Sequence, residues 1–156
     1  MRRFGIVATL NLIVVALLYG NAIVYAQNLI WAKRGGGPGH EESLGLAVDS
    51  VGNSYVTGVF EVSATFGLGE TNETTLISTG FRDIFIGKYD TSGLLLWAKQ
   101  TRGPNGAEGT SIAVDVSGNI YIGGVFFVSA VFGLGEVNET TLISAGIVDI
   151  FIAKYD

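Results

Sequence analysis

Residues 47–58 read AVDSVGNSYVTG, and residues 113–124 read AVDVSGNIYIGG. In both stretches a short apolar run ends at an Asp, turn-forming residues follow, and a run rich in β-branched and aromatic residues then begins. This pattern predicts a β-hairpin. We interpret residues 49–53 as its tight turn, in which the Asp49 carboxylate accepts backbone N–H bonds and Gly52 or Asn53 adopts the left-handed conformation.

The two stretches belong to a tandem duplication with a constant offset of 66 residues. Aligning Trp31 with Trp97 places residues 31–90 on residues 97–156 without a gap, and about 38 of the 60 pairs are identical. A unit of this kind does not bury its own apolar surface and needs neighbours of the same kind. The repeat therefore determines the fold.

Two further strands are predicted in the first unit, at residues 83–89 and 94–99, with a turn at residues 90–93. Alternation along residues 83–89 leaves both faces of that strand largely apolar, as expected where a sheet packs between two others. No window after the N-terminal segment shows a helical apolar stripe, and the 23 Gly residues disfavour helices. Four short antiparallel strands per unit predict an all-β fold built of β-propeller blades.

In this order the motifs resemble the bacterial SBBP (seven-bladed β-propeller) repeat. The resemblance covers residues 29–156 and implies a secreted or surface-exposed bacterial protein, usually with many repeats and with no shared enzymatic activity. This chain departs from the family in having about two repeats. The resembling stretches are residues 47–58, 66–67, 78–80, 83–90, 96–99, 113–122 and 149–156.

Residues 1–26 have the pattern of a signal peptide, with Arg2 and Arg3, an apolar run over 4–19 and Ala26 before the predicted cleavage point. The alternative is a retained membrane anchor, because a run of about 20 apolar residues spans a bilayer. Cleavage leaves seven Lys and Arg against fourteen Asp and Glu, a net charge of −7. We therefore expect a signal peptide (1–26), a first repeat (27–96) and a second repeat (97–156), a secreted or cell-surface product, and no stable membrane insertion after cleavage.

The composition excludes several classes of site. The whole chain has a net charge of −5 and no basic block, so it lacks the charge pattern of a nucleic-acid-binding protein. It has no Cys, which excludes disulfides, iron–sulfur ligation and thiol catalysis, and its single His excludes a His-pair metal motif. We expect no catalytic, cofactor or metal residues, and the sequence does not identify a binding site.

The charged and amide residues that recur in register are more simply explained by blade construction than by a site, because a site needs its residues once. A calcium loop at residues 49–53 is the alternative, but the EF-hand spacing and its closing Glu are absent. Asp83 and Lys88 are expected at the solvated rim of a blade, where they would pair with neighbouring blades. The recurring pairs are Asp49/Asp115, Asn53/Asn119, Asp83/Asp149 and Lys88/Lys154.

The segment from Ser63 to Gly80 is expected to form a long inter-strand loop that recurs nearly unchanged and can serve as a binding surface. Its Gly-Leu-Gly at 67–69 is interpreted as a turn, since no third Gly and no helix follow as a phosphate loop requires. Asn72-Glu73-Thr74 matches the glycosylation pattern, which we interpret as coincidence copied by duplication.

Positions that differ between the repeats are where a unique function would lie, and His40 is interpreted as a solvated turn residue. The aromatic residues are interpreted as blade core, with a sugar-binding platform as the alternative. The differing pairs are Arg34/Gln100, His40/Gly106, Glu41/Ala107 and Arg82/Val148, and the aromatic candidates are Trp31, Trp97, Tyr55 and Tyr121.

Residues 29–33 resemble the last strand of a unit, so strand counting gives eight strands, or two blades. Because propellers have about four to eight blades, two blades leave apolar faces uncovered. We favour a fragment of a longer repeat protein over a homo-oligomer that closes the ring. We expect an exported, non-enzymatic scaffold for protein or glycan contacts, with an oligomeric lectin-like protein as the alternative.

Overall fold

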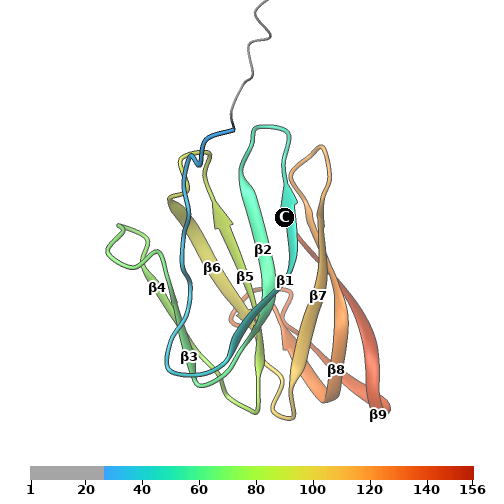
Figure 1. The fold of residues 1–156 in the computed structure, drawn as a ribbon. Coiled ribbons are helices and arrows are strands. Elements are labelled where there is room, and N and C mark those ends of the chain that lie inside the picture. Colours follow the sequence, from blue (N-terminus) through green and yellow to red (C-terminus); the bar gives the residue numbers. More distant parts are fainter. Residues whose placement is uncertain (1–26) are drawn as a thin grey trace, which may run out of the picture. The chain divides into compact units, whose positions relative to one another are not determined.

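The computed structural model describes residues 27–156, and the predicted signal peptide lies outside them. All regular structure in this part is β, as predicted (Figure 1). No helix of residues 27–156 has the length and apolar character needed to cross a membrane. The strands are β1 (Glu41–Val48), β2 (Ser54–Phe60), β3 (Ser63–Phe66), β4 (Thr74–Ile77), β5 (Asp83–Tyr89), β6 (Leu95–Thr101), β7 (Ala107–Val114), β8 (Ile120–Phe132) and β9 (Thr140–Tyr155).

The first repeat forms a four-stranded antiparallel sheet in the order β1-β2-β5-β6, which confirms the predicted hairpin and the two strands after it. β1 contains a register shift between Ser43 and Gly45. The predicted boundary between residues 96 and 97 falls within β6, which completes the first sheet.

The second repeat forms a three-stranded antiparallel sheet in the order β7-β8-β9. β8 lies between its two neighbours, so β9 is an edge strand, and within residues 27–156 no strand pairs with its outer edge (Figure 1). The corresponding edge of β5 in the first sheet is paired with β6.

The prediction of a long loop over residues 63–80 is wrong. In the first repeat β3 and β4 pair as a separate hairpin. In the second repeat the equivalent residues extend β8 and β9 into one long hairpin. In the first repeat each of these strands is only four residues long, which concealed the pairing. Val62 and Val128, at equivalent positions, have φ angles of 60° and 63°, and β8 shifts register between Phe127 and Ser129.

The prediction of a strand at residues 29–33 is also wrong for this structure, which has no regular strand in residues 27–40. A β-strand requires a hydrogen-bonded neighbour, and here the chain makes only an isolated bridge between Gly36 and Thr65. The equivalent bridge between Arg102 and Val131 follows β6. Residues 31–36 therefore lie against the β3–β4 hairpin in the same way that residues 97–102 lie against the outer part of the β8–β9 hairpin.

Within residues 27–156 the core consists of two clusters of buried side chains. One lies within the first repeat and includes Phe60, Phe66 and Phe85. The other joins the two sheets, since Ile84 and Ile86 of β5 belong to the same cluster as residues of the second repeat. Burying each such Ile stabilises the fold by about 1.5–3 kcal/mol. The sheets therefore pack face to face, and the second repeat members of this cluster are Ala107, Ile120, Ile122, Phe126, Ala130, Phe132 and Phe151.

Candidate functional site

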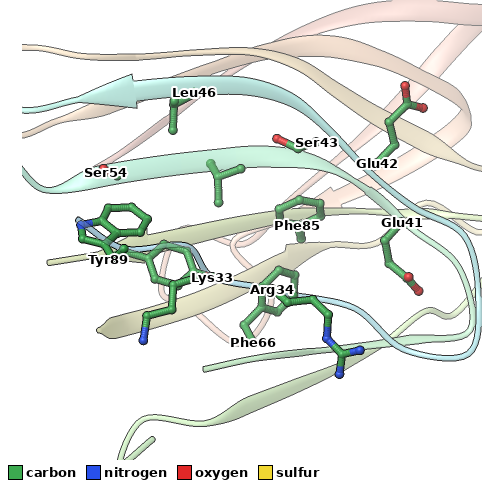
Figure 2. Close-up of a pocket in the computed structure, with 13 residues that line it drawn as sticks. Lys33, Arg34, Glu41, Glu42, Ser43, Leu46, Ser54, Phe66, Phe85 and Tyr89 are labelled. Carbon is green, nitrogen blue, oxygen red and sulfur yellow. The ribbon is translucent and has the colours of Figure 1, made fainter. Parts of the chain in front are cut away.

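A cavity of about 450 Å³ lies between residues 31–35 and the face formed by β1 and β2. Figure 2 shows Lys33 and Arg34 on one side of it and Ser43 and Leu46 on the other. Both apolar and charged side chains line it, and the 31–35 segment is held in place by contacts to the hairpin and the β5–β6 turn. It is the best candidate for a ligand pocket in the described residues.

The cations of this cavity are only partly available to a ligand. Lys33 Nζ lies 2.6 Å from Glu70 Oε1, and the backbone N–H of Leu95 donates to Glu70 Oε2 at 2.6 Å. The hydrogen bond from Lys33, followed by that from Leu95, lowers the pKa of Glu70 below its ordinary value. Burial, with a smaller effect of the Glu70 charge, raises the pKa of Tyr89. Glu70 thus links both residues 31–35 and the start of β6 to the β3–β4 hairpin.

The equivalent region of the second repeat is filled. Leu46 and Val56, which line the cavity, correspond to Ile112 and Ile122 at the 66-residue offset. Ile122 is 2% exposed and lies in the cluster shared with Ile84 and Ile86, and Ile112 packs against that cluster. The cavity is therefore the space that a neighbouring sheet occupies in the second repeat.

The turn predicted at residues 49–53 is confirmed. Asp49 Oδ1 accepts the backbone N–H bonds of Val51 (3.0 Å) and Asn53 (2.9 Å), while Oδ2 accepts bonds from the Asn53 amide (2.8 Å) and the Tyr55 hydroxyl (3.1 Å). Gly52 has a φ of 92°. Although burial acts to raise it, the pKa of Asp49 is lowered by the hydrogen bonds from Asn53, Tyr55 and Val51.

The same turn recurs in the second repeat. Asp115 accepts the backbone bonds of Ser117 and Asn119 and the side-chain bonds of Asn119 and Tyr121. Its pKa is lowered, chiefly by the Asn119 side chain. Within residues 27–156 no group of three or more His, Asp or Glu residues is arranged to hold a metal ion. The carboxylates thus organise their own turns.

The prediction that Asp83 lies at a solvated rim is wrong. Its side chain is fully buried and accepts hydrogen bonds from the backbone N–H groups of Gly103 (2.9 Å) and Thr79 (3.0 Å) and from the Thr79 hydroxyl (3.3 Å). The connection from β6 to β7 covers the start of β5, which brings these donors to the carboxylate. Lys88, by contrast, lies over the Tyr55 ring, with Nζ 4.9 Å from its centroid.

The four aromatic candidates do not form one platform. Tyr55 is fully buried, and Trp97 packs edge-on against it with ring centroids 6.4 Å apart. Tyr121 is 36% exposed and donates to Asp115, while Trp31 lines the cavity. Trp97 and Tyr55 therefore serve the core, and Trp31 is the member placed to meet a ligand.

His40 is exposed, with Nε2 3.8 Å from Glu42 Oε2, in keeping with its interpretation as a solvated residue. The Gly-Leu-Gly at 67–69 forms the turn region between β3 and β4, and Gly67 and Gly69 have φ angles of 64° and 79°. These residues provide turn geometry.

Sequence reasoning missed one organising residue, Glu70, and singled out Arg82 only as a position that differs between the repeats. Arg82 lies 3.3 Å from Glu61 and 3.1 Å from Glu108, so it joins the two repeats. Its replacement by Val148 in the second repeat was the available signal.

Comparisons with known proteins agree with this architecture. Residues 96–125 match the SBBP family model, described as a beta-propeller repeat. The chain is also 29% identical to "Uncharacterized WD repeat-containing protein L264" of Acanthamoeba polyphaga mimivirus, over an alignment that includes 96% of this chain and 11% of the relative. The chain thus spans about a tenth of the length of that relative. The resemblance to the SBBP repeat is confirmed.

Proposed function

We propose that this β-propeller repeat protein is exported and acts, without enzymatic activity, as a rigid scaffold for protein or glycan contacts at or outside the cell surface. The observation that carries the proposal is the shared core between the sheets, in which Ile84 and Ile86 of one repeat are covered by the other. Such packing fixes the relative positions of the blades and leaves their turns and hairpins free for contacts.

The repeated polar residues support a structural role. Asp49 and Asp115 direct their carboxylates into their own turns. The turn of the β3–β4 hairpin and the turn between β8 and β9 both begin with Gly-Leu-Gly-Glu and both end with Asn-Glu-Thr-Thr. A scaffold that presents a repeated surface accounts for both observations.

Export is proposed from the sequence of residues 1–26 and is tested by fusing a reporter to the C-terminus of the full chain and fractionating the cells. We expect the reporter outside the cytoplasm and a mature product that begins at Gln27, identified by mass spectrometry. A matched variant, Val14→Asp with Leu17→Arg, interrupts the apolar run and is expected to remain uncleaved in the cytoplasm. Cytoplasmic retention of the unmodified chain would overturn this part of the proposal.

A lectin-like function is the second candidate, favoured by Trp31 at the cavity beside Arg34. Aromatic side chains with adjacent polar groups suit sugar rings. It predicts binding on a glycan array that Trp31→Ala abolishes and Trp31→Phe retains. The scaffold proposal predicts that the Trp31→Ala variant retains whatever contacts the exposed hairpins make.

A further inference from the structure

We propose that the chain associates head to tail with a second copy of itself. In this arrangement the exposed face of β8 and β9 in one copy packs against the cavity-lining face of β1 and β2 in the next. Residues 31–35 of that next copy then pair with the free edge of β9. The inference goes beyond the proposed function and depends neither on export nor on a ligand.

The first observation is a large difference in burial between equivalent residues. Ile84 and Ile86 of β5 are 0% and 1% exposed, whereas Ile150 and Ile152 of β9, at the same positions of the second repeat, are each 80% exposed. The first pair is buried by the second repeat, through Ile122 and its neighbours. The second pair has no covering sheet within the described residues.

The complementary face is also present and exposed. The residues that cover Ile84 and Ile86 include Ile112 and Ile122, whose equivalents in the first repeat are Leu46 and Val56. Leu46 is 69% exposed, and both residues line the cavity. Inside the molecule, the β5 face of the first repeat packs against the β7–β8 face of the second. The equivalents of both faces, on β9 and on β1 and β2, are uncovered in the described residues. Two different surfaces of one molecule that fit each other make a head-to-tail contact.

Side-chain sizes at one tight point of the internal interface, where Gly109 faces Thr57, are exchanged in the proposed contact between copies. A Cβ added to Gly109 would lie 2.6 Å from Thr57 Oγ1, which is too close for two atoms that are not bonded. Thr57 therefore requires a glycine at position 109. At the equivalent positions of the other repeat the larger side chain and the glycine change places: Ser43 is the equivalent of Gly109, and Gly123 is the equivalent of Thr57. The head-to-tail contact places Ser43 against Gly123, again one side chain opposite a glycine. The exchange removes the contact with Thr57, and Ile150 must shift slightly beside Ser43, because its equivalent Ile84 has Cγ2 only 2.8 Å from a Cβ on Gly109.

The backbone provides a matching strand. β6 pairs with β5 so that Ile84, Ile86 and Lys88 oppose Thr101, Lys99 and Trp97. Transferring this register by 66 residues pairs Ile150 with Gly35, Ile152 with Lys33 and Lys154 with Trp31. The second sheet would then have the four strands that the first sheet has.

Residues 31–36 are already held in the orientation that this pairing needs. Lys33 bonds to Glu70 as Lys99 bonds to Glu136, and Gly36 bridges Thr65 as Arg102 bridges Val131. Since β6 makes the second set of contacts while it pairs with β5, residues 31–36 can make the first set while they pair with β9. Adding an extended segment to an exposed sheet edge is a common recognition mode.

One internal contact is not reproduced, which makes the interface between copies weaker than the internal one. Arg82 lies 3.1 Å from Glu108, but the equivalents are Val148 and Glu42. Val148→Arg would restore the pair across the new interface. Closing rings of about four to eight blades needs about two to four copies.

Position-specific cross-linking of the full chain tests the register. The chain has no Cys, and Ala32 and Ala153 are predicted to lie directly opposite each other, at a separation that suits a disulfide. Mixing the single variants Ala32→Cys and Ala153→Cys under mild oxidation should give a disulfide-linked heterodimer. Ala145→Cys, on the same strand but outside the predicted pairing, is the matched control and should give at most a tenth of that yield with Ala32→Cys.

Sedimentation of the full chain tests the face. Ile150→Lys should weaken self-association at least tenfold, and Val148→Arg should strengthen it about two- to fivefold. Ile143→Lys is the control, because Ile143 is 79% exposed and its equivalent Ile77 stays 64% exposed where the repeats pack together. All variants carry the same residues 1–26, so differences among them report on these faces.

Equal cross-linking with the Ala145→Cys control, or equal association of the Ile143→Lys and Ile150→Lys variants, would overturn the proposal and assign the faces to another occupant, such as a further repeat. An Ile150→Lys variant that keeps the β-sheet circular dichroism spectrum and loses association supports it. Failure of export or of glycan binding leaves these outcomes unchanged.

Discussion

The carboxylate of Asp83 accepts a hydrogen bond from the backbone N–H of Gly103 at 2.9 Å, in a fully buried position. This bond joins the start of β5 to the connection between the two repeats. Thr79 donates two further bonds to the same side chain, so the carboxylate holds three donors.

Replacing Asp83 with Ala is expected to lower the free energy of unfolding by about 2–3 kcal/mol, because three donors lose their acceptor and one of them, the Gly103 N–H, is left in a buried place. Asp149→Ala is the matched control, since Asp149 at the equivalent position accepts a bond from Ala145 N–H and is less buried. Its expected loss is about 1 kcal/mol. Urea denaturation of both variants makes the comparison, and equal losses would contradict a special role for the Gly103 bond.

Much of the fold follows from the sequence, because hairpin turns and alternating strands leave local signals. The Asp49 turn was predicted down to its hydrogen-bond acceptor, since an Asp followed by a Gly three residues later acts on its own backbone. The burial of Asp83 was missed because it depends on Gly103, twenty residues away, which covers it only after β5 and β6 pair.

The cavity was predictable only in part. The need for neighbouring blades indicated uncovered apolar faces, and Leu46 and Ile150 are such residues. The roles of Lys33 and Glu70 were not predicted, because their pairing depends on the β3–β4 hairpin, which was interpreted as a loop. Pairing between strands of only four residues has little signature in the sequence.

Gly93 provides a test of how residues 31–36 are held. Its φ is 80°, and an added Cβ would lie 2.7 Å from the Trp31 ring. Gly93→Ala is therefore expected to destabilise the fold through left-handed strain of about 1–2 kcal/mol and to displace Trp31. Acrylamide quenching of tryptophan fluorescence should increase as the indole leaves its place.

The control for this variant is Gly69→Ala. Gly69 has a φ of 79°, but a Cβ there meets no atom within 4 Å. It should show the same backbone strain with no change in quenching. If both variants quench alike, Trp31 does not pack on the turn at Gly93.

Acid is expected to destabilise the protein through the carboxylates that organise turns and the hairpin. The Asn119 side-chain bond is the main cause of the lowered pKa of Asp115, and the Lys33 bond is the main cause for Glu70. A group with a lowered folded pKa contributes stability above its unfolded pKa, here about 3.8 for Asp115 and 4.5 for Glu70, and loses it as pH falls through the folded pKa. The melting temperature should therefore be nearly constant from about pH 7 to 5.5 and fall below about pH 4.5.

Asp115→Asn provides the control for this pH dependence. The amide cannot ionise, so the variant should melt lower than the unmodified chain at neutral pH and lose less on acidification. Differential scanning calorimetry between about pH 7 and 2.5 measures both quantities. A drop on acidification as large as that of the unmodified chain would show that Asp115 does not contribute.

Arg82 gives a measure of the packing between the two repeats. Its guanidinium lies 3.1 Å from Glu108 of β7, and both side chains are partly buried. A double-mutant cycle with Arg82→Met and Glu108→Gln is expected to give a coupling energy of up to about 1 kcal/mol, decreasing in high salt. Glu42→Gln is the matched control, because Glu42 is the first-repeat equivalent of Glu108 and lies beside His40. The coupling energy between Glu42 and Arg82 should be near zero. Equal coupling energies for the two glutamates would mean that Arg82 responds to the overall charge of the chain and that the cycle does not measure the contact between the repeats.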